Sequence, residues 1–338
     1  MFQLFLCSFL LLNCFIQQIQ AVEILELDII SYEDLIQANP QAIEILRKAL
    51  HTKGIVGVRD VPDYKEKYEQ FIIATQTFNA LPEDIKEQYK PNRQVGDTFL
   101  GYEIGKEKFK RPNGEWIIDD LKTSYYALVP EDSHNKRPRE VDLQNPFEEL
   151  GMIMAQTGEL VMRKIGLLNN IPEFNLAQDP CTGRMLYYRK SEDNSNPYWC
   201  GEHFDHSLFT AILPAVYFVE GKQIPEPLEA GLFVRTSPDT PFKKIIADDI
   251  NVMMFQVGEF GQLISNDNIR ATEHRVHKAS GTIERYTLAL FFNAPMDTPI
   301  YSTSMLTADA RYGAHAEPCT FRHWHEASFK RYVVSDDE

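Results

Sequence analysis

The segment Cys200–Ser207, CGEHFDHS, contains four side chains that can bind a metal ion or carry a proton. They are Glu202, His203, Asp205 and His206. If residues 203–213 form a strand, successive side chains point to opposite faces of the sheet. His203 and Asp205 then share one face, whereas Glu202 and His206 share the other. A metal ion on one face is therefore predicted to bind the first pair and to exclude the second.

A third protein ligand must come from another strand, because two ligands leave most of a coordination sphere empty. The segment 271–287, ATEHRVHKASGTIERYT, offers His274 or His277. Two histidines and one carboxylate form the facial triad that suits non-haem Fe(II) and leaves positions open for a cosubstrate and O2. His323 and His325 form a further HxH pair, but we expect them in a helix, where this spacing makes the two side chains diverge.

A candidate carboxylate receptor lies in the strand-like segment 285–292, RYTLALFF. Alternation places Arg285 and Thr287 on the same face of that strand. A guanidinium group binds a carboxylate through two parallel hydrogen bonds, and a neighbouring hydroxyl can donate a further one. The pair is therefore a candidate receptor for a carboxylate, with an ordinary surface ion pair on a strand as the alternative.

These side chains require a sheet to hold them together. From Gly183 onward, short β-branched and aromatic runs alternate with turn residues, which predicts an antiparallel sandwich or barrel. The first half reads mainly as helix, with a helix starting at Pro40 and a long one over 147–168. We expect long loops over 92–146 and a closing helix over 320–333.

Charge and composition exclude some classes of protein. The formal net charge of −15 argues against nucleic acid as a partner, because binding its phosphates requires clustered Lys and Arg. Of five cysteines, only Cys181, Cys200 and Cys319 lie beyond residue 21, and none forms a CxxC motif. We therefore expect free thiols and not a disulfide framework or a thiolate metal site.

Residues 1–21, MFQLFLCSFLLLNCFIQQIQA, carry no charged side chain and resemble a signal peptide, with an apolar run too short to span a bilayer. We expect entry into the secretory pathway or export, with a cytoplasmic location as the alternative. The mature chain is predicted to have no membrane-spanning segment. Val22 onward, VEILELDII, is predicted to open the folded part as a strand.

An ordered set of motifs resembles one known family, the iron(II)- and 2-oxoglutarate-dependent dioxygenases of the isopenicillin N synthase-like group. The motifs are HFD at 203–205, Thr210, GLFV at 231–234, VGEFGQLISN at 257–266, HRV at 274–276 and RYT at 285–287. The resemblance extends over about residues 23–330. It implies a mainly β fold with α-helices: a double-stranded β-helix (jelly-roll) core flanked by N-terminal helices and a C-terminal helix.

The resemblance also implies site residues and a domain organisation. The iron ligands are expected at His203, Asp205 and His274, with His277 on the outer face of its strand. Arg285 and Thr287 match the pair that binds the distal carboxylate of 2-oxoglutarate, and Tyr188 matches a tyrosine that contacts this cosubstrate. The expected divisions are a signal peptide (1–21), an N-terminal helical and loop region (22–182) and the jelly-roll core with its C-terminal helix (183–330).

The activity implied is oxidation, by default hydroxylation, of a small-molecule substrate by a monomer that uses Fe(II), 2-oxoglutarate and O2, with release of succinate and CO2. An exported enzyme would also need ascorbate or another reductant. One alternative is an oxidase of the same fold that does not use 2-oxoglutarate, and another is a barrel that binds a metal or small molecule without turnover.

The sequence departs from the family pattern at Ser207, where Gly is common, and at Thr287, where Ser is usual. The segments 191–200 and 214–230 are longer than in the family, and we expect both at the mouth of the barrel. Trp116, Tyr125 and Tyr126 are candidate pocket walls or ordinary packing residues. These departures concern the substrate and not the metal.

Overall fold

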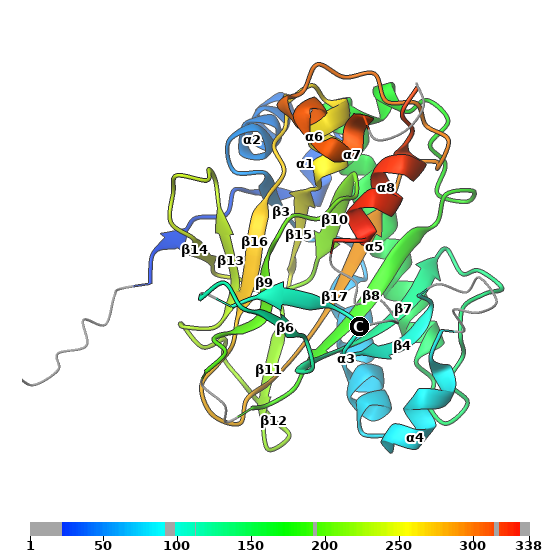
Figure 1. Cartoon of the computed structure of the whole chain (residues 1–338), viewed down its shortest axis with the longest axis vertical. Coiled ribbons are helices and arrows are strands. Elements are labelled where there is room, and N and C mark those ends of the chain that lie inside the picture. The colour runs from blue at the N-terminus through cyan, green and yellow to red at the C-terminus, as the bar shows by residue number, and fades with distance from the viewer. Residues whose placement is uncertain (1–21, 92–98, 112, 192–194, 314–317, 332–338) are drawn as a thin grey trace, which may run out of the picture.

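Two sheets pack against each other and form the centre of the molecule (Figure 1). The structure, a computed structural model, describes residues 22–91, 99–111, 113–191, 195–313 and 318–331. The predicted signal peptide lies outside the described residues, so export and cleavage stay predictions. Among the described residues, no helix is both long and apolar enough to cross a bilayer.

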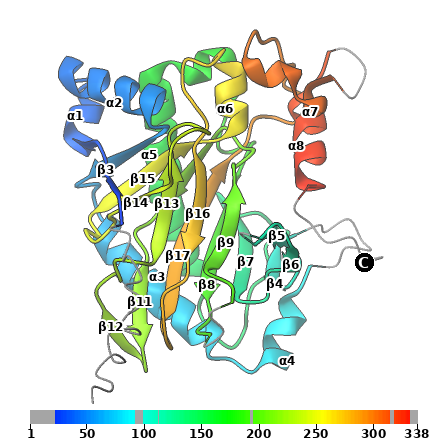
Figure 2. The same cartoon turned by 60° about the vertical axis from the view of Figure 1, so that its left-hand side comes forward.

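The smaller sheet has five strands and carries His203 of the HxD motif and the whole HRV motif. Its order is β1 (Ile24–Leu25), β14 (Lys243–Ile245), β13 (Gly231–Arg235), β16 (Glu273–His277) and β9 (Tyr198–His203). Figure 2 shows β13, β16 and β9 side by side. The β1–β14 pair is parallel, and the other pairs are antiparallel.

The larger sheet has ten strands. Its main order is β2 (Ile29–Ser31), β3 (Ile55–Arg59), β15 (Val252–Val257), β10 (Phe209–Ile212), β17 (Glu284–Phe292), β8 (Cys181–Tyr188), β7 (Lys122–Val129) and β4 (Gly101–Ile104). β11 (Val216–Val219) also pairs with β17, and β12 (Lys222–Ile224) pairs with β11. A separate hairpin, β5 (Lys108–Lys110) and β6 (Trp116–Ile118), stands beside β9.

Apolar side chains from both sheets meet in the interior. One cluster joins Leu232 and Val234 of the smaller sheet to Ile55 and Met254 of the larger one. Burial of such side chains from water is the main favourable contribution to the packing of the sheets. This arrangement confirms the predicted jelly-roll core with flanking helices.

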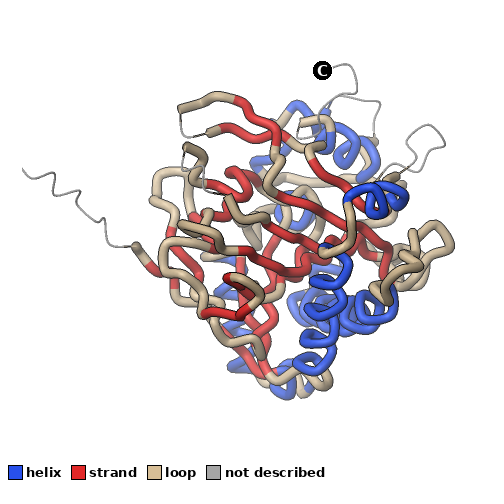
Figure 3. The backbone as a smooth tube through the Cα atoms, turned by 90° about the horizontal axis from the view of Figure 1, so that it is seen from below, coloured by secondary structure: helices blue, strands red, loops and turns tan. Residues whose placement is uncertain are grey.

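Helices cover the outer face of the larger sheet, and Figure 3 shows them mainly along one side of the strands. They are α1 (Tyr32–Ile36), α2 (Pro40–Thr52), α3 (Tyr64–Asn79), α4 (Glu83–Lys86) and α5 (Gln144–Ile165). α2 begins at Pro40, as predicted, with the Asn39 side chain accepting a hydrogen bond from the Gln41 N–H. α5 packs close to β17, where a Cβ at Gly158 would lie 2.2 Å from the Phe292 ring.

The C-terminal part covers one end of the sheets with α6 (Glu259–Ile264), α7 (Ala310–Gly313) and α8 (Phe321–Phe329). α8 confirms the predicted closing helix over the part of 320–333 that the structure describes. Its Trp324 is fully buried, and the indole N–H donates to the His206 carbonyl at 3.3 Å. This contact places the helix beside the HFDH segment.

Two predictions about the N-terminal half were wrong. Within 92–146, predicted as long loops, the described residues include β4, β5, β6 and β7. β7 is buried on both faces, so its sequence KTSYYALV lacks the alternation that marks a half-exposed strand. VEILELDII forms two short strands instead of one, and β1 and β2 join different sheets.

Candidate metal centre

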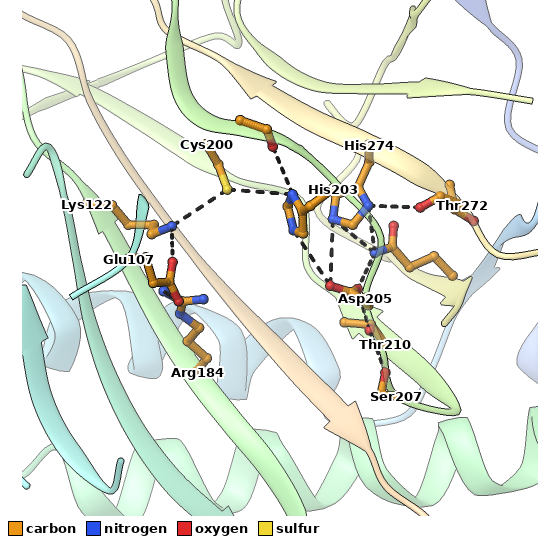
Figure 4. Close-up of polar contacts among 12 residues, drawn as sticks. Glu107, Lys122, Arg184, Cys200, His203, Asp205, Ser207, Thr210, Thr272 and His274 are labelled. Atoms are coloured by element: carbon orange, nitrogen blue, oxygen red, sulfur yellow. Dashed lines mark hydrogen bonds and ion pairs between the residues drawn. The ribbon is translucent and has the colours of Figure 1, made fainter. Parts of the chain in front are cut away.

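His203, Asp205 and His274, here called the triad, converge between the two sheets (Figure 4). One ligand atom from each residue lies within 4.8 Å of the other two. His203 ends β9 and is the direct register partner of His274 on β16. The Nε2 atoms of His203 and His274 lie 3.8 and 3.9 Å from Asp205 Oδ1. The structure therefore brings together the three side chains that the sequence singled out.

Backbone carbonyls fix the orientation of both imidazoles. His203 Nδ1 lies 2.8 Å from the Gly201 carbonyl, and His274 Nδ1 lies 3.0 Å from the Thr272 carbonyl. Because a carbonyl oxygen only accepts, each Nδ1 carries the proton, and each Nε2 is the ring nitrogen that can bind a metal. Burial, together with the neighbouring His203, lowers the pKa of His274 to about 4, so this ring is neutral at pH 7.

Two donors orient the Asp205 carboxylate. Its Oδ2 accepts hydrogen bonds from the Thr210 hydroxyl at 2.6 Å and from the Gln256 amide at 2.5 Å. Burial would raise the pKa of Asp205, but His274, His203 and these two hydrogen bonds bring it below its ordinary value. Oδ1 is thereby left to face the imidazoles. Two imidazole nitrogens and one carboxylate oxygen fit the donor set that non-haem Fe(II) takes.

Gln256 was not predicted, although the sequence carried a signal for it. It is the one polar side chain in the β15 segment VMMFQV, all of which is buried. A buried amide requires hydrogen-bond partners, and this one finds Asp205.

The strand alternation that separated His203 and Asp205 from their neighbours was only partly right. β9 ends at His203, so Asp205 lies just beyond the strand and its direction is not set by the pleat. Glu202 pairs with Arg275 at 2.6 Å, but it also lines the same cavity as Asp205. His206 lines this cavity as well and lies 3.0 Å from His325 Nδ1. Burial, with His325 beside it, lowers the pKa of His206 to about 3.

His277 lies on the face of β16 opposite to His274. Its ring stacks on Phe233, with the two centroids 4.0 Å apart. The side chain is half-buried and not turned to open solvent, but it is directed away from the triad.

Arg285 is buried, with 4% of its surface exposed, and stands between two tyrosine rings. Its Cζ lies 4.7 Å from the ring centroid of Tyr188 and 6.0 Å from that of Tyr217. The Nε donates to the Tyr217 hydroxyl at 3.2 Å, whereas Nη1 is buried without a hydrogen-bond partner. A buried cationic N–H that lacks a partner is costly, so this group fits an acidic ligand.

Thr287 has a different partner from the one that the resemblance implies. Its hydroxyl donates to the Leu213 carbonyl at 2.8 Å. A threonine has one hydroxyl proton, so in this structure it is not available to a carboxylate. Arg285 is therefore the main donor of the proposed receptor.

A cavity of about 620 Å³ opens beside the triad. Its aromatic walls include Phe109, Trp116, Tyr126, Phe204, Phe291 and Phe329. Two of the three candidate wall residues, Trp116 and Tyr126, are therefore in the lining. Tyr125, in contrast, packs against Phe78 and Phe147 in the core.

The two long segments differ in their position relative to this cavity. Tyr198 and Cys200, at the end of 191–200, line it. No residue of 214–230 does, so the prediction that this segment lies at the mouth is not supported. Arg285 is also outside the lining.

Two buried side chains, Lys122 and Asp119, and two partly buried ones, Glu107 and Arg184, form an ion-pair cluster in the cavity wall. Figure 4 shows Lys122, Glu107 and Arg184. Lys122 Nζ lies 2.7 Å from carboxylate oxygens of both Glu107 and Asp119, and Arg184 lies 2.9 Å from Glu107. Glu107 and Asp119 flank the β5–β6 hairpin, so Lys122 holds both of its ends. Burial would raise the pKa of Glu107, but Arg184 and Lys122 hold it well below its ordinary value.

Cys200 lies between this ion-pair cluster and the triad. Its Sγ is 3.6 Å from Lys122 Nζ and 3.9 Å from His203 Nδ1. Burial raises the pKa of the Cys200 thiol. Cys181, Cys200 and Cys319 are all free thiols, as predicted.

Residues 181–294 match the sequence model of the 2OG-Fe(II) oxygenase superfamily. No curated protein matches the chain. Among solved structures, a 2OG-Fe(II) oxygenase family protein from Caulobacter crescentus is similar, with 17% identity, a TM-score of 0.70 and coverage of 90% of this chain and 99% of the other.

Two ligand complexes are also similar in fold. A Neurospora crassa protein in complex with alpha-KG and 5-formyluracil is 19% identical, with a TM-score of 0.66 and coverage of 89% of this chain and 95% of that protein. JOX2 in complex with 2OG, Fe and JA is 18% identical, with a TM-score of 0.67 and coverage of 94% and 92%. Residues 181–294 are therefore similar to the 2OG-Fe(II) oxygenase superfamily, and the chain as a whole shares the fold of these solved oxygenases.

Proposed function

We propose that this protein is a non-haem Fe(II)- and 2-oxoglutarate-dependent dioxygenase that hydroxylates a small molecule and releases succinate and CO2. The observation that carries the proposal is the convergence of two imidazoles and one carboxylate, of which His203 and Asp205 line a cavity. Such a donor set binds Fe(II) and leaves coordination positions open.

Each residue of the centre has a separate role. His203 and His274 would hold the metal through Nε2, and Asp205 would hold it through Oδ1. Thr210 and Gln256 keep the carboxylate oriented, because they bind its other oxygen. When bound, Fe(II) and 2-oxoglutarate supply the activation of O2 by oxidative decarboxylation.

Arg285 is the proposed receptor for the distal carboxylate of 2-oxoglutarate. The support is its burial, its unpartnered Nη1 and the absence, among the described residues, of an ion pair to any protein carboxylate. The Tyr188 ring lies against the guanidinium and restricts its position.

The cavity supports a small-molecule substrate. Its volume of about 620 Å³ lies within the range of ligand pockets, about 300–1,000 Å³. Aromatic walls would exclude water from the reacting centre and contact an apolar or planar substrate. The two similar complexes contain small molecules, 5-formyluracil in the Neurospora crassa protein and JA in JOX2. A monomeric state, and ascorbate as the reductant, stay predictions.

Equilibrium binding of Fe(II) under anaerobic conditions tests the metal centre. His274→Ala should weaken Fe(II) binding by at least about tenfold, since one of three ligands is lost. His277→Ala is the matched control, because it removes the same side chain from the opposite face of the same strand. Equal affinity in the two variants, or no Fe(II) bound by the unmodified protein, would disprove the triad.

A further inference from the structure

We infer that Tyr217 and Glu226 are positioning residues that hold Arg285 ready for a carboxylate ligand. The inference rests on the proposed function, in which Arg285 receives the distal carboxylate of 2-oxoglutarate. The three residues form a hydrogen-bond chain, here called the Arg285 chain, which runs from Glu226 through Tyr217 to the guanidinium.

The direction of each hydrogen bond in the Arg285 chain is fixed by chemistry. Arg285 Nε can only donate, and it lies 3.2 Å from the Tyr217 hydroxyl. That hydroxyl has one proton, which it gives to Glu226 Oε1 at 3.0 Å. Because the carboxylate can only accept, the hydroxyl oxygen is kept as an acceptor for Arg285.

The Arg285 chain is buried, and burial makes its hydrogen bonds stronger than they would be in water. Tyr217 has 1% of its surface exposed, and the Glu226 side chain has 8% exposed. Burial, only partly opposed by Arg285, raises the pKa of Tyr217, so the phenol keeps its proton at physiological pH. The Glu226 carboxylate is thus linked to the guanidinium only through the Tyr217 hydroxyl. Arg285 Nη1 therefore stays without a partner and can bind an external ligand.

The backbone around Glu226 is built to admit this carboxylate. A Cβ at Gly231 would lie 2.2 Å from Glu226 Oε1 and 2.8 Å from the Tyr217 hydroxyl, so a larger residue would displace both. Gly231 also has a φ of +96°, which favours glycine. Lys244 fixes the same turn, because its Nζ donates to the Pro227 and Ala230 carbonyls at 2.5 and 2.6 Å.

The Arg285 chain borders the interior that contains the triad. Tyr217 on β11 is the register partner of Arg285 on β17. Its ring belongs to the apolar cluster that includes Val276, which lies two residues after His274 on the same face of β16. The long segment 214–230 therefore carries Glu226 to the cosubstrate receptor and does not contribute to the substrate cavity.

The test is the dissociation constant of 2-oxoglutarate, measured by calorimetry on Fe(II)-loaded protein without oxygen. Tyr217→Phe removes only the hydroxyl and should weaken 2-oxoglutarate binding by about tenfold, as expected for a hydrogen bond to a charged group. Glu226→Gln keeps the shape but removes the charge, and it should weaken binding by about threefold. Fe(II) affinity should stay unchanged in both variants.

Two controls separate positioning from a general effect on the fold. Tyr187 lies on the face of β8 opposite to Tyr188 and donates a hydrogen bond to Glu284 on β17. Tyr187→Phe removes this other tyrosine–glutamate hydrogen bond and should leave 2-oxoglutarate binding unchanged. 2-Oxobutyrate lacks the distal carboxylate, so its affinity should not respond to Tyr217→Phe. Equal loss for both 2-oxo acids would overturn the inference.

The remaining outcomes are also distinguishable. If the unmodified protein binds Fe(II) but not 2-oxoglutarate, the proposed function fails, and the inference fails with it. If the unmodified protein binds 2-oxoglutarate and both variants bind it equally well, the inference alone is overturned. Should Tyr217→Phe fail to fold, as judged by circular dichroism, Glu226→Gln decides the question.

Discussion

His203 and His274 face each other across β9 and β16 as direct register partners, with ring centroids 4.2 Å apart. Beyond this pair the register shifts, and Val276 pairs with Cys200. The shift is a β-bulge that inserts one extra residue into β9 and turns the Cys200 side chain toward the interior. The same bulge explains why a thiol lies within 4 Å of a proposed metal ligand.

The orientation of Asp205 by Thr210 leads to a prediction about metal affinity. Thr210→Val removes the hydroxyl that donates to Oδ2, with little change in shape. Loss of such an outer contact should weaken Fe(II) binding by about tenfold. Thr157→Val is the control, because Thr157 is equally buried but its hydroxyl donates to the Ile153 carbonyl within α5. An anaerobic Fe(II) titration that shows no difference between these variants would contradict the role of Thr210.

Lys122 is predicted to stabilise the fold through the ion-pair cluster. Lys122→Met leaves the carboxylates of Glu107 and Asp119 without their shared cation. Breaking a buried pair on one side should lower the free energy of unfolding by about 3 kcal/mol in urea denaturation. Adding Asp119→Asn should restore part of this loss, because it removes one of the uncompensated charges.

Lys67→Met provides the matched control for the ion-pair cluster. Lys67 also forms a lysine–glutamate pair, with Glu149 at 2.8 Å, but on the surface. Its replacement should leave the free energy of unfolding nearly unchanged, since exposed pairs contribute little. If Lys122→Met were as mild as this control, the ion-pair cluster would not hold the hairpin in place.

His277 is predicted to make the fold less stable in mild acid. Burial, with Arg275 and Lys244 nearby, lowers the pKa of His277 to about 4, below its ordinary value in the unfolded chain. Above an unfolded pKa of about 6.5 the ring is neutral in both states, so it causes no loss. As the pH falls from about 6.5 to about 4, the unfolded chain takes up the proton first and the folded state loses stability.

His277→Phe keeps an aromatic ring against Phe233 but removes this titration. The variant should lose less stability than the unmodified protein between pH 7 and pH 5, by about 1–2 kcal/mol. Urea denaturation at the two pH values measures the difference. Equal losses of stability in both proteins would show that the pKa of His277 does not differ between the folded and unfolded states.

The sequence predicted the triad because its three residues lie in short motifs whose order along the chain is distinctive. The supporting residues could not be predicted in the same way. Gln256, Tyr217 and Glu226 act through contacts between residues distant in the chain, which depend on strand register and on the path of 214–230. β7 was missed because a strand buried on both faces has no period-two pattern.

Oxygen uptake measured together with succinate formation tests the proposed function most directly. Protein loaded with Fe(II) and 2-oxoglutarate should consume O2 and form an equal amount of succinate, and His274→Ala should abolish both. His277→Ala should retain both, because it leaves the triad intact. Oxygen uptake without succinate would contradict the proposal and favour an oxidase of the same fold.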